Sequence, residues 1–247
     1  MKHLVLAGTL LLAVALVNCG GGSGGDPGGT TPHPLDGTWR GTLSAGVQIS
    51  FRIDAAGTVS DFQSGGGGGG ALLGGTASAG PDVYVLTLQN TTGDLVDCPF
   101  LVDPAGRHGT FVLLGVAPTF ISLFAAMERG ATNAPTYFAP DIWGSWTGFG
   151  YAYDQPSLDF VPISPATATA ADGTPDDLFT VGLPGSIFDG AFDGGVLSLG
   201  IWGGTVNISL AEVIVIMSFD KSYVAVMSRP ATVTGTEDYS FFALNRN

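Results

Sequence analysis

The stretch GTWRG at residues 37–41 returns later in the chain as GSWTG at residues 144–148. Two further pairs of blocks follow in the same order: TFV at 110–112 before Pro118 with SYV at 222–224 before Pro230, and SLFA at 122–125 with SFFA at 240–243. Matched blocks in one order indicate an internal duplication. We therefore expect two related units, at residues 35–130 and 141–247.

Within these units the local pattern is typical of strands. In residues 47–53, VQISFRI, apolar and polar side chains alternate, which is the period of a strand with one buried face. After a turn signal at 54–57, the pattern predicts further strands, at residues 58–62, 83–88, 205–210 and 222–228. A glycine-rich loop is expected at 64–75.

Helix is expected to be scarce, because no stretch of 11 or more residues keeps a helical period. The longest apolar run of the folded part, TFVLLGVAPTFISLFAAM at residues 110–127, has the length of a membrane span. Gly115 and Pro118 lie near its middle and favour two buried strands joined at residues 117–118. The sequence therefore predicts an all-β fold of mostly antiparallel strands, with under about 10% helix.

The N-terminus carries a different signal. Lys2 is followed by an uncharged apolar run at residues 4–17, which is too short to span a bilayer comfortably and is typical of a secretory signal. The run ends at Cys19, and a glycine-rich tract follows it. Such a tract forms a flexible tether. We assign residues 1–18 to a signal peptide and residues 19–34 to an anchor and linker.

The residues at the junction, LVNC at 16–19, resemble the lipobox of bacterial lipoproteins. The resemblance implies that Cys19 is lipidated, by palmitate among other acyl chains. It also implies sorting to the outer membrane of a Gram-negative bacterium, because Gly20 rather than Asp follows the cysteine. An ordinary secretory signal with an incidental cysteine is the alternative. The expected partner is thus the membrane, reached through the lipid.

Charge and composition narrow the function classes. The 247 residues include 21 acidic and only 8 basic side chains, which gives a formal net charge of −13. A chain with this balance repels nucleic acid, so binding to a phosphate backbone is excluded. Hydrophobic residues make up 45% of the chain, which is too many for a disordered protein.

Each unit opens on a Gly-x-Trp motif and ends on a strand followed by arginine, and this resembles the calycin pattern of lipocalins and their relatives. In that family the basic residue lies across the indole and closes the barrel. The resemblance implies that Arg129 covers Trp39 and that Arg246 covers Trp146. It also implies two small barrels, although sandwiches or one joint sheet remain open, and a small apolar ligand held inside a barrel.

Residues suited to catalysis are scarce. Cys98 is expected to be a small buried core residue rather than a nucleophile, because no histidine partner is evident. His108 is expected to be an exposed histidine in the turn DPAGRHG at residues 103–109. The serine-hydrolase motif Gly-x-Ser-x-Gly and the clusters of His or Cys that bind zinc are absent from the sequence. We therefore predict no catalytic residue, no metal and no cofactor.

Two acidic loops of the second half leave alternatives open. One contains Asp172, Asp176 and Asp177, and the other contains Asp189 and Asp193. Aspartates of this kind are common in turns, but they also supply oxygen ligands to calcium, or a pair of carboxylates to a glycoside hydrolase. An envelope hydrolase that uses these aspartates is the alternative function.

The remaining feature is the aromatic segment IWGSWTGFGYAYD at residues 142–154. On a strand, Phe149, Tyr151 and Tyr153 share one face, and Trp146 lies on the other. Such a stripe belongs to a core, or it lines a pocket or a sugar-binding surface. Taken together, the sequence predicts a lipid-anchored cell-envelope β protein that binds a ligand or an envelope protein, or has a structural role, rather than an enzyme.

Overall fold

The computed structural model describes residues 31–65, 72–77, 83–114, 121–154, 159–171, 177–183, 186–192, 200–206, 211–230 and 239–247. Residues Pro32–Asn247 form one compact unit. Within the described residues, strands account for all regular structure except one short 3-10 turn, η1 (Ala139–Ile142). The predicted all-β fold is therefore confirmed.

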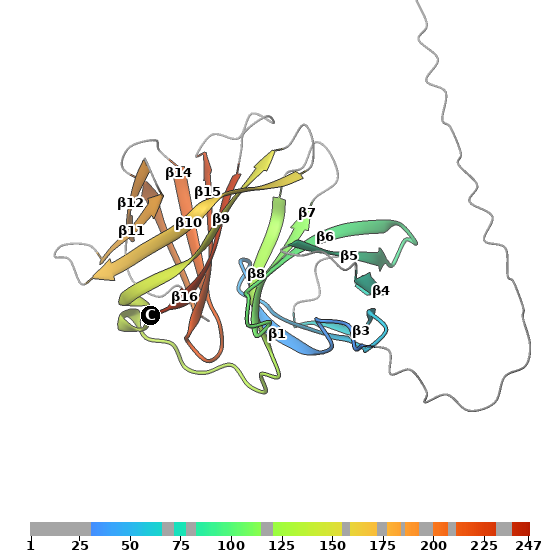
Figure 1. The fold of residues 1–247 in the computed structure, drawn as a ribbon. Helices are drawn as coiled ribbons and strands as arrows, with labels where there is room; N and C mark the ends of the chain where they lie inside the picture. Colours follow the sequence, from blue (N-terminus) through green and yellow to red (C-terminus); the bar gives the residue numbers. More distant parts are fainter. Residues whose placement is uncertain are drawn as a thin grey trace, which may run out of the picture. The chain divides into compact units, whose positions relative to one another are not determined.

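The first half forms a closed barrel of eight antiparallel strands (Figure 1). Its strands are β1 (Gly37–Leu43), β2 (Gln48–Ile53), β3 (Thr58–Ser64), β4 (Leu72–Ala77), β5 (Val83–Asn90), β6 (Leu95–Val102), β7 (His108–Leu114) and β8 (Ile121–Arg129). Each strand pairs with the next, and β1 pairs with β8 to close the ring. An antiparallel barrel of this kind fits a calycin-like β fold.

The second half closes in the same way, because β9 pairs with both β10 and β16. Its strands are β9 (Gly144–Asp154), β10 (Asp159–Ala171), β11 (Asp177–Leu183), β12 (Ser186–Phe192), β13 (Ile201–Val206), β14 (Ala211–Met217), β15 (Tyr223–Pro230) and β16 (Tyr239–Arg246). Closure leaves neither ring with an unpaired edge strand. The two halves are thus two rings rather than one joint sheet.

Most local predictions hold, and one needs correction. In β2, Ile49, Phe51 and Ile53 are buried between more exposed neighbours, as the alternation predicted. Of the strand predicted at 205–210, residues 205 and 206 lie in β13, and residues 207–210 lie outside the described part. The loop predicted at 64–75 is wrong at its end, because the chain pairs as β4 from Leu72 onward.

The apolar run at residues 110–127 forms two strands, β7 and β8, as predicted; its joint at residues 117–118 lies outside the described residues. Both faces of these strands are covered. Phe111 and Met127 lie in the core of the first barrel, whereas Val112 and Phe124 belong to a cluster that includes Tyr223 and Phe241 of the second. Burial on both faces explains why the run is continuously apolar.

The second glycine of each Gly-x-Trp-x-Gly block lies where the barrel closes. A Cβ atom on Gly41 would collide with the main-chain carbonyl of Ala126 on β8. At Gly148 it would collide in the same way with the carbonyl of Ala243 on β16. Only glycine permits this approach of first and last strand, so the repeated block marks the same structural position in both barrels.

Candidate functional site

The turn between β6 and β7 positions the first part of a polar cluster. Asp103 opens this turn, and its Oδ1 accepts a hydrogen bond from the main-chain N–H of Arg107 at 2.8 Å. The main-chain N–H of Asp103 donates to the carbonyl of His108 at 2.9 Å, and Gly106 provides the positive φ of 65° that the turn requires. As a result, the His108 Nδ1 atom lies 3.1 Å from Asp103 Oδ2.

The turn between β14 and β15 positions the second part. The Ser218 hydroxyl and the main-chain N–H of Ser222 donate to Asp220 Oδ1, at 2.6 and 3.0 Å. The Ser222 hydroxyl donates to Asp220 Oδ2 at 2.7 Å. Hydrogen bonds within this turn therefore orient the Asp220 carboxylate without any contribution from the first barrel.

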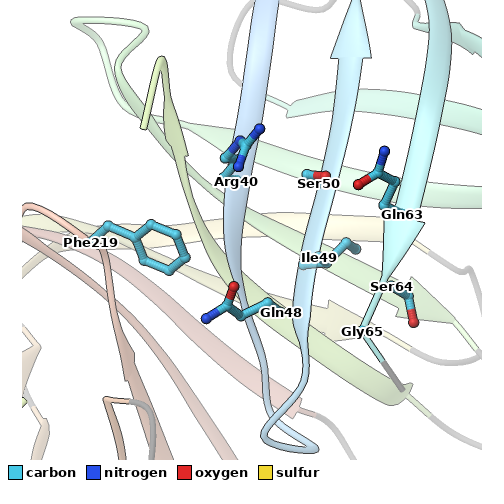
Figure 2. A pocket seen from close by; sticks show the side chains of 8 residues that line it. All are labelled: Arg40, Gln48, Ile49, Ser50, Gln63, Ser64, Gly65 and Phe219. Atoms are coloured by element: carbon cyan, nitrogen blue, oxygen red, sulfur yellow. The ribbon is translucent and has the colours of Figure 1, made fainter. Parts of the chain in front are cut away.

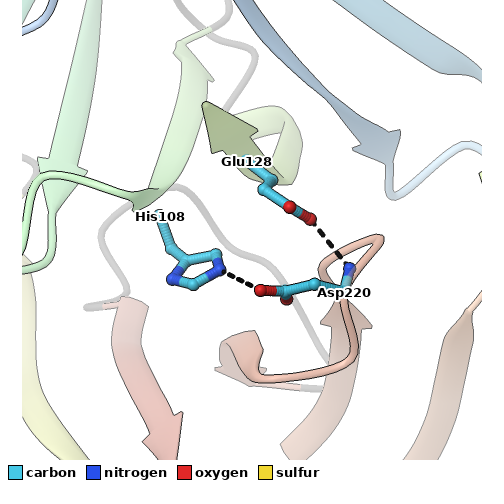
Figure 3. Close-up of side chains that lie close together, drawn as sticks. All are labelled: His108, Glu128 and Asp220. Atoms are coloured by element: carbon cyan, nitrogen blue, oxygen red, sulfur yellow. Dashed lines mark hydrogen bonds and ion pairs between the residues drawn. The ribbon is translucent and has the colours of Figure 1, made fainter. Parts of the chain in front are cut away.

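The two parts meet in a cluster that joins the barrels (Figure 3). His108 Nε2 lies 3.0 Å from Asp220 Oδ2, and the main-chain N–H of Asp220 donates to Glu128 Oε2 at 2.8 Å. The Arg107 guanidinium lies 2.8 Å from the same Asp220 oxygen. We call Asp103, His108, Glu128 and Asp220 the histidine–carboxylate junction.

The expectation that His108 is an exposed turn residue is wrong. It is the first residue of β7 and only 4% exposed. Its ring stacks on Tyr223 with centroids 5.2 Å apart, and the Tyr223 hydroxyl is hydrogen-bonded to Thr110 at 2.6 Å. The second barrel supplies both Asp220 and Tyr223, and these two residues cover the His108 side chain.

Electrostatics keep the junction ionised. Burial by itself lowers the pKa of His108, but the hydrogen bonds and charges of Asp103 and Asp220 outweigh it and raise this pKa to about 9. Burial opposes ionisation of Asp220, yet the hydrogen bonds from His108 and Ser218 hold its pKa well below the usual range. The pKa of Asp103 is lowered as well, against its burial, by His108 and the N–H of Arg107. At neutral pH, an imidazolium thus lies between two carboxylates.

This charge state does not suit a serine hydrolase. Ser222 Oγ is 3.3 Å from His108 Nε2, and Asp103 lies at the other ring nitrogen, in the order of a catalytic triad. A general base must be neutral to take the serine proton, whereas His108 is protonated. The hydroxyl proton of Ser222 is directed at Asp220 instead. The contacts describe an ion-pair network rather than an activated nucleophile.

The same cluster is the place where the described residues could hold a metal ion. One ligand atom from each of His108, Glu128 and Asp220 lies within 4.8 Å of the others. A divalent cation would need a deprotonated imidazole. Arg107 also lies in contact with Asp220, and 3.8 Å from Glu128. The positive charges of Arg107 and His108 balance two of the three carboxylates of the junction, so a divalent cation would compete with cations already in contact with these groups.

The structure brings both tryptophan–arginine pairs together. The Arg129 guanidinium lies 5.2 Å from the Trp39 ring centre, and that of Arg246 lies 4.6 Å from the Trp146 ring centre. Each indole N–H donates to the carbonyl four residues upstream, at 2.9 and 3.0 Å. Each pair also lies in register between the first and last strands of its barrel. The arginines therefore cover the indoles where the rings close.

The other predicted residues divide into described and undescribed positions. Cys98 is a free, fully buried thiol, as expected, and burial raises its pKa to about 12. A thiol in this state is unreactive. Cys19 and the loop aspartates, with the exception of Asp177 and Asp189, lie outside the described residues. Asp177 and Asp189 belong to β11 and β12, but their side chains are outside the described part.

The aromatic segment at residues 142–154 has two environments. Tyr151 and Tyr153 are buried among residues of both barrels, and Trp146 is buried on the opposite face of β9. Phe149 differs, because 46% of its surface is exposed. Phe149 and Tyr151 line a recess of about 650 Å³ together with Tyr84, Asp103 and Arg129. The core interpretation is thus correct for Tyr151 and Tyr153, and wrong for Phe149.

A smaller recess of about 240 Å³ involves the first strands (Figure 2). Polar side chains of β1, β2 and β3 line it, among them Arg40, Ser50 and Gln63, and Phe219 stands on its other side. Arg40 donates to the main-chain carbonyl of Thr132 at 2.9 Å. Arg40 is the one ionisable group of its lining, so this recess offers no acid–base pair.

Comparisons with known proteins add little to this geometry. No family model matches the chain, and no curated protein matches it. Four chains of solved structures match, among them the crystal structure of a protein of unknown function from the DUF3598 family, from Nostoc punctiforme PCC 73102. The two sequences are 12% identical, with a TM-score of 0.41, over 87% of this chain and 97% of that chain. Within the described residues, no helix has the length and hydropathy to cross a membrane.

Proposed function

We propose that this protein is a lipid-anchored β-barrel module of the bacterial cell envelope, with a binding or structural role rather than a catalytic one. The non-catalytic part depends on one observation. The buried histidine of the junction is paired on both ring nitrogens with carboxylates, and these raise its pKa to about 9. A histidine in this state joins two barrels and does not perform general base catalysis.

The anchor and the location depend on the sequence of the N-terminus. A short apolar run, the lipobox-like residues 16–19 and the glycine tether support lipidation of Cys19 and attachment to the outer membrane. We also propose that the two barrels descend from one duplicated unit. The matching Trp39–Arg129 and Trp146–Arg246 pairs support this proposal.

The interior of the first barrel does not suit the expected small apolar ligand. Side chains fill the described interior of the first barrel, where the rings of Trp39, Phe51, Phe100 and Phe111 lie with centroids between 4.8 and 6.5 Å apart. A small apolar ligand would have to displace these rings. A binding role therefore favours a surface recess over this interior.

Membrane fractionation of the parent and a Cys19→Ser variant tests the anchor. Cells are grown with radiolabelled palmitate, and the inner and outer membranes are then separated. The proposal expects label in the parent at the outer membrane, and an unlabelled, released variant. An unlabelled parent, or a variant that stays in the membrane fraction as before, would contradict it.

The hydrolase alternative is tested separately with model glycosides and esters. Turnover that is lost in Asp172→Asn, Asp176→Asn or Asp189→Asn variants would replace the binding role with a catalytic one. We expect no turnover by the parent.

A further inference from the structure

The recess beside the histidine–carboxylate junction combines aromatic walls with charged groups of both signs. Its aromatic lining comes from Tyr84 on β5 and from Phe149 and Tyr151 on β9. Asp103 and Arg129 add a carboxylate and a guanidinium to the same lining. A volume of about 650 Å³ is typical of a small-ligand site.

Phe149 is the feature that requires an explanation. It lies on the same strand face as Tyr151 and Tyr153, which are buried, yet 46% of its own surface is exposed. An exposed aromatic side chain at the wall of a recess offers a flat apolar face to a ligand. Any ligand that covers the Phe149 ring removes apolar surface from water and gains the corresponding free energy.

The polar groups decide which kind of ligand fits. The Arg129 guanidinium donates to the main-chain carbonyls of Pro34 and Asp36, which uses two of its five N–H donors. Asp103 accepts hydrogen bonds from Arg107 and His108 on its two oxygens, and its side chain is only 5% exposed, so the Arg129 guanidinium is the charged group with donors left for a ligand. A purely apolar ligand would cover this guanidinium without bonding it, at a cost in free energy. An anionic ligand would face the carboxylate and a protein of net charge −13.

We infer that this recess is a carbohydrate-binding site for a neutral saccharide of one or two hexose rings. The C–H face of a pyranose carries partial positive charge and stacks on an aromatic face, here the Phe149 ring. Hydroxyl groups accept hydrogen bonds from the remaining N–H donors of Arg129 without adding a charge beside Asp103. The inference rests on the proposed binding role and identifies its ligand class.

Saturation-transfer NMR on the full-length protein in a sugar-free detergent tests the site. The probes are the disaccharides cellobiose, maltose and chitobiose. We expect at least one of them to bind, with the strongest transfer to C–H protons on one ring face. Because Phe149 is largely exposed, Phe149→Ala is expected to fold normally and to weaken binding by about five- to tenfold, as loss of one aromatic stacking partner implies.

The matched control is Leu95→Ala, which also truncates an exposed apolar side chain, 70% exposed, and does not line the recess. This variant should bind like the parent. Binding of no disaccharide, or binding equal in Phe149→Ala and the parent, would overturn the site and leave the anchor and its fractionation untouched. Hydrolysis of a bound disaccharide would instead uphold the site and refute the non-catalytic proposed function.

Discussion

His108 is expected to make the stability of the protein fall as pH rises from neutral to alkaline. Its pKa is about 9 in the folded protein, against an ordinary value of 6.5 that applies to the unfolded chain. The folded state therefore holds a proton that the unfolded state has lost between these values. Its contribution is complete below pH 6.5 and disappears as pH rises through 9.

The pKa difference sets the magnitude. At about 1.4 kcal/mol for each pH unit, protonation of His108 accounts for about 3 kcal/mol of the free energy of unfolding at neutral pH. Solvent screening removes little of this, because the imidazole is 5% exposed. Asp103 and Asp220 act in the opposite sense. Since their pKa values are lowered in the fold, their contribution is lost only as pH falls below the ordinary value of 3.8.

Urea unfolding followed by tryptophan fluorescence measures the effect, because Trp39 and Trp146 are both buried. We expect the free energy of unfolding to fall by about 3 kcal/mol between pH 6.5 and 9.5. In His108→Gln most of this fall should be lost, with a smaller fall left near pH 9 from the buried Cys98 thiol, and the protein should be less stable at neutral pH because Asp103 and Asp220 lose their shared cation. A matched control, His33→Gln, removes the other histidine of the described chain and should keep the fall. A parent as stable at pH 9.5 as at 6.5 would refute an imidazolium in the junction.

Three further outcomes follow from the barrels. Trp39→Ala should cost about 3–5 kcal/mol in urea unfolding, because it empties a fully buried indole site beneath Arg129, whereas Leu95→Ala should cost under about 0.5 kcal/mol. Gly41→Ala should lower the melting temperature measured by circular dichroism, because its Cβ has no space beside the Ala126 carbonyl; an unchanged melting temperature would show that the strands can separate without cost. Cys98 should resist iodoacetamide at pH 8 in the native protein and react once urea unfolds it, since burial raises its pKa to about 12; fast labelling of the native protein would contradict the buried position.

Local sequence patterns, which span only a few residues, predicted most of the strands that were expected. Alternation in residues 47–53 predicted β2, since burial of one strand face is a property of successive residues. The run at 110–127 was resolved into β7 and β8 by its central glycine and proline. The repeated block indicated a duplication, but only the structure shows that Gly41 and Gly148 lie where the first and last strands approach closely. Residues 205 and 206 of the strand predicted at 205–210 belong to β13, whose start at Ile201 the pattern did not predict, because glycines occupy positions 203 and 204.

The histidine–carboxylate junction could not be predicted from local sequence patterns. The turn at residues 103–109 predicts that Asp103 and His108 are near each other, since only five positions separate them, but Asp220 lies 112 residues beyond His108. No local pattern connects groups so far apart, and the burial of His108 depends on Tyr223 of the other barrel. Phe149 is exposed and Tyr151 is buried although both lie on one face of β9, and this difference also depends on contacts with residues distant in the sequence.

The sequence by itself determined the all-β class, strands β2, β3, β5, β7 and β8 of the first barrel and the burial of Cys98, because each of these depends on the hydrophobic pattern within a few residues. Only the tertiary structure decided that His108 is a buried cation, that Asp220 neutralises it and that Phe149 faces an open recess. Those properties depend on which surfaces of two barrels are in contact. Contact between distant strands removes water from one side chain and leaves it on the next, and this changes both pKa and accessibility.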